Sequence, residues 1–119
     1  MAQDRPTAAE LLSAIADFLR EEAIPALDRS DPRLGFQMRV AVNSLAILER
    51  EARLGPAADA RERQRLKELL GRDGTVEELN RLLAHELRTG QRDERDAALM
   101  VHLEATIADK IAIANPKWR

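Results

Sequence analysis

The sequence predicts an all-α protein, an antiparallel bundle of about five helices around a central helix over residues 33–54. Apolar residues recur at three- and four-residue spacing along most of the chain, and no run alternates with a period of two. Short stretches with glycine, proline and capping residues separate these apolar runs. Because short connections favour antiparallel neighbours, the helices should pack side by side. The 119 residues are expected to form one domain, residues 1–119.

The composition indicates an aliphatic core and a charged surface. Hydrophobic residues make up 45% of the chain, charged residues 34% and aromatic residues only 3%. The net charge of −2, with both signs well mixed, lacks the basic footprint of a protein that binds nucleic acid or an anionic membrane. The absence of cysteine excludes disulfides and thiolate sites. The first residues have no apolar signal segment, so we expect a cytoplasmic protein with no nucleic-acid or membrane partner.

The first helix should begin at a capping box formed by Thr7 and Glu10. It should end near residue 22 or 23, because Pro25 disfavours the α conformation at the residue before it. In the alternative, Pro25 lies in the first turn of a short helical extension through Leu27. One apolar stripe at helical spacing follows the cap and comprises Leu11, Leu12, Ile15, Phe18 and Leu19.

The central helix is the element around which the others should pack, because it is apolar on two sides. Ser30 or Asp31 should cap it with Pro32 in its first turn, and Gly55 and Pro56 should end it after Leu54. The second apolar face is available for a partner, which makes a homodimer the expected assembly. The first face comprises Leu34, Met38, Ala41, Leu45, Leu48 and Ala52, and the second comprises Phe36, Val40, Ile47 and Leu54.

Three further helices are expected in the second half of the chain. The third should run from Ala60 to Leu70, capped by Asp59, with residues 61–67 as a solvated face of ion pairs. A second capping box over residues 75–78 should start the fourth helix, which ends at Gly90. The last helix should span residues 94–114. Its apolar face comprises Leu99, Met100, Leu103, Ile107, Ile111 and Ala114.

A polar stripe on the central helix provides the first candidate site. Arg39 and Asn43 lie one turn apart between the two apolar faces, and both can donate hydrogen bonds to an anionic or carbonyl group. They are therefore candidates for contacting a ligand or a partner. The alternative is a structural role, in which the stripe fixes the helix register or meets a carboxylate from another helix, with Glu22 as a candidate.

The last helix carries the second candidate group. His102, Thr106 and Asp109 fall on one flank, with Lys110 at the edge of the apolar face, and this combination could perform acid–base chemistry. In the alternative, the flank is a partly exposed edge where Lys110 extends to solvent and His102 meets a carboxylate. His85 should be solvated.

Known catalytic and metal-binding motifs are absent. Neither of the two histidines follows a glutamate by three residues, and the chain contains no HExxH, EF-hand, GxGxxG, P-loop or GxSxG motif. We therefore expect no metal and no cofactor, and we assign no catalytic residue. One short pattern, Arg95-Asp96 followed by His102, resembles the Arg–His signature of the HEPN helical ribonucleases. That resemblance implies that Arg95 and His102 share a helix face.

Three blocks in order resemble a small, uncharacterised, all-helical bacterial family. They are RPTAAELLSAIADFLREEAIPAL, RVAVNSLAILERE and DKIAIANPKW, and the similarity covers nearly the whole chain. Genes of this family are found near acyl-CoA dehydrogenases and aminoglycoside-phosphotransferase-like kinases. The resemblance implies a non-catalytic accessory protein linked to acyl-CoA metabolism, with such a dehydrogenase or kinase as partner. The alternative is a binding protein or enzyme for acyl or phospho-acyl compounds that uses Arg39 and Asn43.

Overall fold

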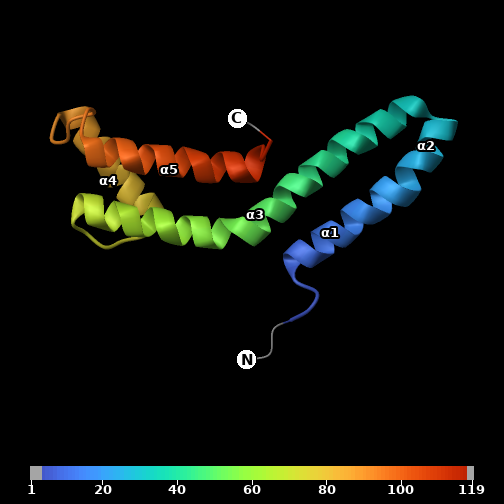
Figure 1. Ribbon diagram of the computed structural model, residues 1–119, viewed down its shortest axis with the longest axis horizontal. Helices are drawn as coiled ribbons and strands as arrows, with labels where there is room; N and C mark the ends of the chain where they lie inside the picture. The colour runs from blue at the N-terminus through green and yellow to red at the C-terminus, as the bar shows by residue number, and fades with distance from the viewer. Residues whose placement is uncertain (1–3, 118–119) are drawn as a thin grey trace. The chain divides into compact units, whose positions relative to one another are not determined.

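The computed structural model describes residues 4–117 and is all-helical over that range, as the sequence predicts. The chain divides into two compact units, an N-terminal unit of residues 1–54 and a C-terminal unit of residues 55–119. The sequence predicts one domain over residues 1–119, and this stays a prediction. The helical elements form four continuous runs (Figure 1), which are α1 (Ala8–Phe18) with η1 (Leu19–Ala23) and α2 (Ile24–Ser30), then α3 (Pro32–Leu70), α4 (Val76–Thr89) and α5 (Ala97–Ala114).

The first helical run begins where the sequence predicts and continues past its predicted end. The backbone N–H of Glu10 donates to the Thr7 hydroxyl at 3.1 Å, and that of Thr7 donates to the Glu10 carboxylate at 2.8 Å. The predicted end at residue 22 or 23 is wrong, because the helix continues through Pro25 to Ser30, as in the alternative reading. Proline crowds the carbonyl one turn before it. The wider π turn η1 accommodates this crowding directly before Pro25.

The central helix is longer than predicted. Asp31 caps it, with its carboxylate accepting the N–H of Leu34 at 3.2 Å, and α3 starts at Pro32 as expected. The predicted stop at residues 55–56 and the separate third helix over 60–70 are both wrong. Pro56 lies inside α3, where a proline removes one backbone hydrogen bond but leaves the flanking turns intact. The helix ends at Leu70, and the next residue, Gly71, has the left-handed φ of 67° that is typical of a helix C-terminus.

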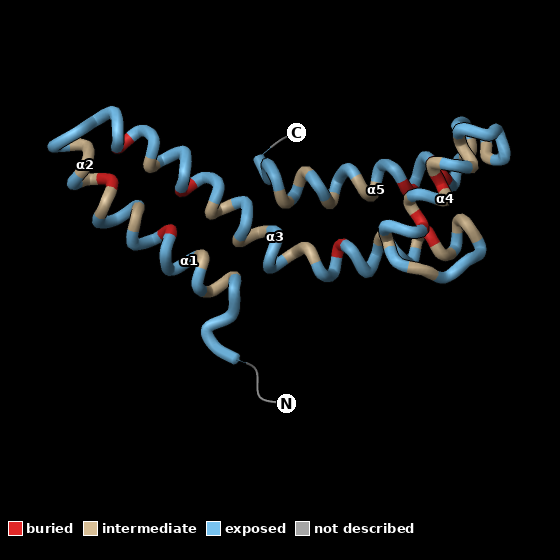
Figure 2. Tube along the Cα trace, turned by 180° about the vertical axis from the view of Figure 1, so that it is seen from behind, coloured by how far each residue is buried: buried red, intermediate tan, exposed pale blue. Residues whose placement is uncertain are grey.

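The N-terminal unit is a helical hairpin. The first helical run lies antiparallel to residues 32–54 of α3, and the buried positions of both face each other (Figure 2). Ala16, Ile24 and Val42 fill the seam between them. The buried positions of α3 in this unit are Gly35 and Val42, which belong to neither of the two predicted apolar faces. Neither predicted face is therefore fully covered. Exposed large side chains remain on both helices: Leu11, Ile15, Phe18, Leu34, Phe36, Val40, Ile47 and Leu48.

The C-terminal unit packs three helical segments around a leucine core. The capping box at Thr75 and the left-handed Gly90 delimit α4 as predicted, whereas α5 starts at Ala97 rather than at residue 94, capped by Asp96. The expected apolar face of the last helix is buried only in part, because Leu99 lies in the core whereas Met100, Leu103 and Ile107 are exposed. Within residues 4–117, no helix is long and apolar enough to cross a lipid bilayer. The core comprises Leu66, Leu79, Leu83 and Leu99.

Candidate functional site

Arg39 is part of an ion pair within the N-terminal hairpin. Both terminal nitrogens of its guanidinium donate hydrogen bonds to the Asp28 carboxylate, and the bond from Nη1 to Oδ1 spans 3.1 Å. This hydrogen bonding raises the pKa of Arg39 above its ordinary value. The acceptor is Asp28, at the end of the first helical run, and not the proposed Glu22, whose side chain is exposed. The Arg39 side chain remains 51% exposed, so the pair lies at the surface.

Asn43 lies one turn from Arg39 on the same side of the hairpin. Both residues line a shallow hollow of about 420 Å³, together with Asp28 and the seam residues Ile24 and Val42. Asn43 is exposed, and neither residue of the predicted stripe is enclosed in a filled core. Whether the stripe contacts a ligand or a partner stays a prediction.

In the C-terminal unit, α3 presents two arginines to the polar flank of α5. Arg61 pairs with Asp109 at 3.0 Å. One turn further along, Arg65 donates from Nε to His102 Nδ1 and from a terminal nitrogen to the Thr106 hydroxyl, both at 3.1 Å. The predicted grouping of the three residues on one flank of the last helix is therefore confirmed. The predicted exposed edge with a carboxylate at His102 is wrong, because that side chain is 4% exposed and its neighbour is a guanidinium.

The contact with Arg65 determines the state of His102. Because Nδ1 accepts a hydrogen bond, the ring is neutral and carries its proton on Nε2. Burial and the Arg65 charge lower the pKa of His102, and the Glu62 carboxylate opposes this effect only in part. Glu62 also accepts a hydrogen bond from the Asn80 side chain at 3.1 Å, which ties it to α4. The imidazole is thus held neutral beside a permanent positive charge.

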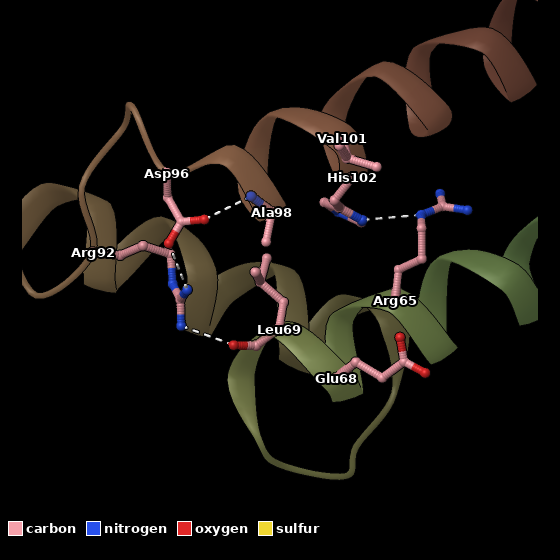
Figure 3. A pocket seen from close by; sticks show the side chains of 8 residues that line it. All are labelled: Arg65, Glu68, Leu69, Arg92, Asp96, Ala98, Val101 and His102. Carbon is pink, nitrogen blue, oxygen red and sulfur yellow. Dashed lines mark hydrogen bonds and ion pairs between the residues drawn. The ribbon is translucent and has the colours of Figure 1, made fainter.

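A hollow of about 490 Å³ lies beside this pair (Figure 3). Its lining contains four charged side chains, His102 and three apolar residues. Arg92 is paired with carboxylates there, because it donates to the Glu86 carboxylate and to the Leu69 carbonyl, each at 3.0 Å, and has the Asp96 carboxylate at 4.0 Å. Arg92 thereby links the C-terminal end of α3 to the connection between α4 and α5. Arg65 differs, because both groups that accept its hydrogen bonds are neutral.

The structure separates the remaining candidates. Lys110 lines another shallow hollow of about 320 Å³ with Ile107 and Ile111, and it does not line the hollow beside His102. Arg95 precedes the first turn of α5, has an 89% exposed side chain and pairs with Asp93 at 3.7 Å. It therefore shares no helix face with His102, and the expected HEPN-like arrangement is wrong. Within residues 4–117, no three His, Asp or Glu side chains cluster as metal ligands would.

Arg61 and Arg65 are the site residues that sequence reasoning missed. They fall in the stretch expected to be a solvated face, and no local pattern distinguishes them from Arg63, which is exposed and pairs with Asp73 at 2.7 Å. The available signal was their spacing of one turn, which matches the spacing of His102 and Thr106 on the opposite helix. Using that signal requires knowledge of which sides of the two helices face each other.

A family model described as "Domain of unknown function (DUF6285)" matches residues 25–118 of this chain. The chain belongs to this family. The match starts at Pro25, so it includes α2 to α5 and leaves the capped α1 outside. No curated protein matches the chain, and no solved structure does. The DUF6285 description itself carries no activity, so the function has to be argued from the structure.

Proposed function

We propose that this DUF6285 protein is a non-catalytic interaction protein that binds a second copy of itself through the N-terminal unit. The observation that carries the proposal is the number of large apolar side chains that the hairpin leaves in contact with water. Phe18 is 61% exposed and Leu48 is 48% exposed, although both lie beside the buried seam. Contiguous exposed apolar surface on a helical protein is typical of an interaction site.

These side chains form one broad face, which we call the open face. On α1, Leu11, Ile15 and Phe18 follow each other at four- and three-residue spacing and form one stripe. On α3, Leu34 and Leu48 are fourteen residues apart, close to four full turns, and form a second stripe. When each helix is viewed from its own N-terminus, its exposed stripe is displaced from its buried residues in the same rotational direction. In an antiparallel pair, such stripes face the same side of the hairpin.

A second hairpin is the occupant that this geometry fits best. Two helices bury only the seam between them, and a second layer of two helices is the common way to cover such a surface, as in four-helix bundles. A two-fold interface brings the same stripes together from both copies, so every apolar residue of the face meets an apolar partner. The dimer would therefore bury the open face of each hairpin.

We further propose that the dimer is a cytoplasmic accessory to an acyl-CoA dehydrogenase or a kinase-like enzyme. The support for this partner class is the resemblance of the three sequence blocks described above. A small-molecule role for Arg39 and Asn43 is less favoured, because Asp28 already occupies both terminal nitrogens of Arg39. A ligand carboxylate would have to displace that ion pair.

Sedimentation velocity and light scattering test the dimer. The wild-type chain should run as a dimer at micromolar concentration, and the double variant Phe18→Glu/Leu48→Glu should be monomeric. Two carboxylates in an apolar interface lose solvation without gaining a partner. Because both positions are exposed, the variant should keep the helical circular dichroism of the wild type.

The matched control is Val40→Glu/Ile47→Glu, which places the same charges on the other exposed stripe of α3. This stripe lies away from the open face, so the control should remain dimeric. A wild-type monomer at high concentration would overturn self-association. Dissociation by the control and not by Phe18→Glu/Leu48→Glu would show that the open face is the wrong surface.

A further inference from the structure

We propose that α5 carries a second, weaker self-association surface, on which the α5 helices of two copies pack together and Glu104 of each copy pairs with Lys110 of the other. The surface belongs to the C-terminal unit, so the proposal goes beyond the dimer proposed for the open face and does not depend on it. We call this surface the α5 face. It comprises Met100, Leu103, Ile107, Ile111 and Ala114, with Glu104 and Lys110 at its two edges.

The exposed surface of α5 is nearly uncharged, unlike that of its neighbour α4. On α5, all of which the structure describes, Glu104 and Lys110 are the only charged residues at exposed positions, and the others are alanine or larger apolar residues. From Leu103 to Ala114, a stretch described without gaps, no residue is fully buried (Figure 2). A helix that is apolar around most of its circumference is normally covered by a neighbour. Every exposed position of α4, by contrast, is polar or charged: Glu77, Glu78, Arg81, His85, Arg88 and Thr89.

The α5 face points away from the core of its unit. The polar flank of α5 is the side that contacts α3, for example through the hydrogen bond from Arg65 to His102. At about 100° per residue, Ile107 lies about 140° around the helix from His102. Ile107 is accordingly 55% exposed, and the shallow hollow of about 320 Å³ described above lies on its side of the helix. The face is therefore uncovered in the single chain, and its hollow can receive a side chain from a neighbour.

Two charged side chains make the α5 face complementary to itself. Glu104 and Lys110 lie three residues before and after Ile107, on opposite sides of the apolar stripe. Among residues 4–117, neither of them forms an ion pair. A two-fold axis that passes between the two copies of Ile107, perpendicular to the line from Glu104 to Lys110, places each Glu104 opposite the Lys110 of the other copy. A second copy thus supplies both missing counter-charges by symmetry.

The contact should be weaker than the dimer through the open face. It uses one helix from each copy, whereas the open face spans two, so it buries less apolar surface. Contacts of small area are typical of transient association, and we expect a Kd on the order of 0.1–1 mM. The α5 face would therefore join chains only where their local concentration is high.

Sedimentation equilibrium tests the contact in the full-length chain that carries Phe18→Glu/Leu48→Glu, in which the open face is blocked. The weight-average mass should rise from that of a monomer at about 10 μM toward that of a dimer at about 1 mM. Adding Ile107→Glu should weaken this association at least about tenfold, because a carboxylate would be buried against apolar side chains. Because Ile107 is exposed in the single chain, this variant should keep its helical circular dichroism.

The matched control is Val101→Glu, which introduces the same charge on the same helix. Val101 is 65% exposed, but it lies about 120° around α5 from Ile107 and outside the α5 face. Association should therefore be unchanged in this control.

Charge reversal distinguishes the symmetric pairing from non-specific apolar association. In the same background, Glu104→Lys and Lys110→Glu should each weaken association at least about tenfold, because each change brings like charges together twice in the dimer. An equimolar mixture of the two variants should associate as the unreversed chain does, because one copy then supplies two cations and the other two carboxylates. Arg81→Glu, on the exposed side of α4, changes the net charge as Lys110→Glu does and should have no effect.

A monomeric mass over the whole concentration range would overturn the proposal. Equal association with and without Ile107→Glu, equal weakening by Val101→Glu and Ile107→Glu, or no recovery in the mixture would also overturn it. The open face is blocked in every sample, so the result does not depend on whether the hairpin dimer forms. Failure here is therefore distinguishable from failure of the dimer proposal.

Discussion

The two units of this chain bury their apolar side chains with different numbers of helices. The N-terminal unit is a two-helix hairpin whose seam is filled by small and branched residues and crossed by the ion pair of Arg39 with Asp28. The C-terminal unit adds a third helix, which allows Leu66 to be fully enclosed, and it ties α3 to α5 with Arg61 and Arg65. One unit thus has a closed core, and the other has an open seam.

The comparison shows how the number of layers decides what a helix exposes. Two packed helices enclose a line of side chains, so stripes beside that line stay in water whatever their hydrophobicity. Three helices enclose a volume, and there a buried histidine can be held neutral by a neighbouring arginine. The hairpin is accordingly suited to docking, and the three-helix unit is suited to holding a defined polar site.

The largest expected difference between the units is the cost of truncating a buried side chain. Leu66→Ala should lower the free energy of unfolding by about 3–5 kcal/mol, because the enclosed cavity cannot collapse. Ile24→Ala, in the open seam, should cost about 2–3 kcal/mol, because neighbouring side chains can move into the space. Urea denaturation, with hydrogen exchange to assign the loss of protection to each unit, measures both values. Equal costs would contradict the contrast between closed and open packing.

A smaller effect, confined to the C-terminal unit, should appear on acidification. The pKa of His102 is lowered in the folded chain from the ordinary value of 6.5, chiefly by burial and then by Arg65, against the opposing charge of Glu62. The unfolded chain therefore takes up this proton first. The contribution of His102 to the free energy of unfolding should be constant above pH 6.5. It should decrease as the pH falls from 6.5 toward the lowered pKa, and then level off.

The control for this prediction is His102→Gln, whose side-chain oxygen can still accept a hydrogen bond from Arg65 but cannot titrate. The difference in the free energy of unfolding between wild type and variant should change with pH below 6.5 and stay constant above it. A pH-independent difference would show that His102 titrates alike in the folded and unfolded chains.

The smallest expected effect concerns the Arg39–Asp28 ion pair of the hairpin, which a substitution at Gly35 should disturb. In a helix, Gly→Ala usually stabilises by about 1 kcal/mol. At Gly35, however, the new Cβ would lie 2.3 Å from the Asp28 carboxylate, which must then move away from Arg39. Gly35→Ala should therefore be neutral or slightly destabilising in the wild type and stabilising by about 1 kcal/mol in an Asp28→Ala background. Thermal unfolding of the four proteins measures this, and an equal gain in both backgrounds would contradict it.

Local signals in the sequence were sufficient for the fold class and for several helix ends. The capping boxes at Thr7 and Thr75 and the glycine at residue 90 act within one turn of the backbone, so their effect depends little on the rest of the chain. The helical periodicity also established the grouping of His102 with Thr106, because residues one turn apart always share a flank.

The length of α3, the rotation of α5 and the partners of the arginines depended on packing. Pro56 loses one backbone hydrogen bond, a local cost that contacts elsewhere can offset, so its effect on the helix could not be predicted from the residue alone. Periodicity identifies the stripes of a helix but not which stripe faces a neighbour. For α5 the polar flank faces α3, because Arg61 and Arg65 meet it there, while Met100 and Ile107 remain in water. Such pairings join residues far apart in the chain, and only their arrangement in space selects them.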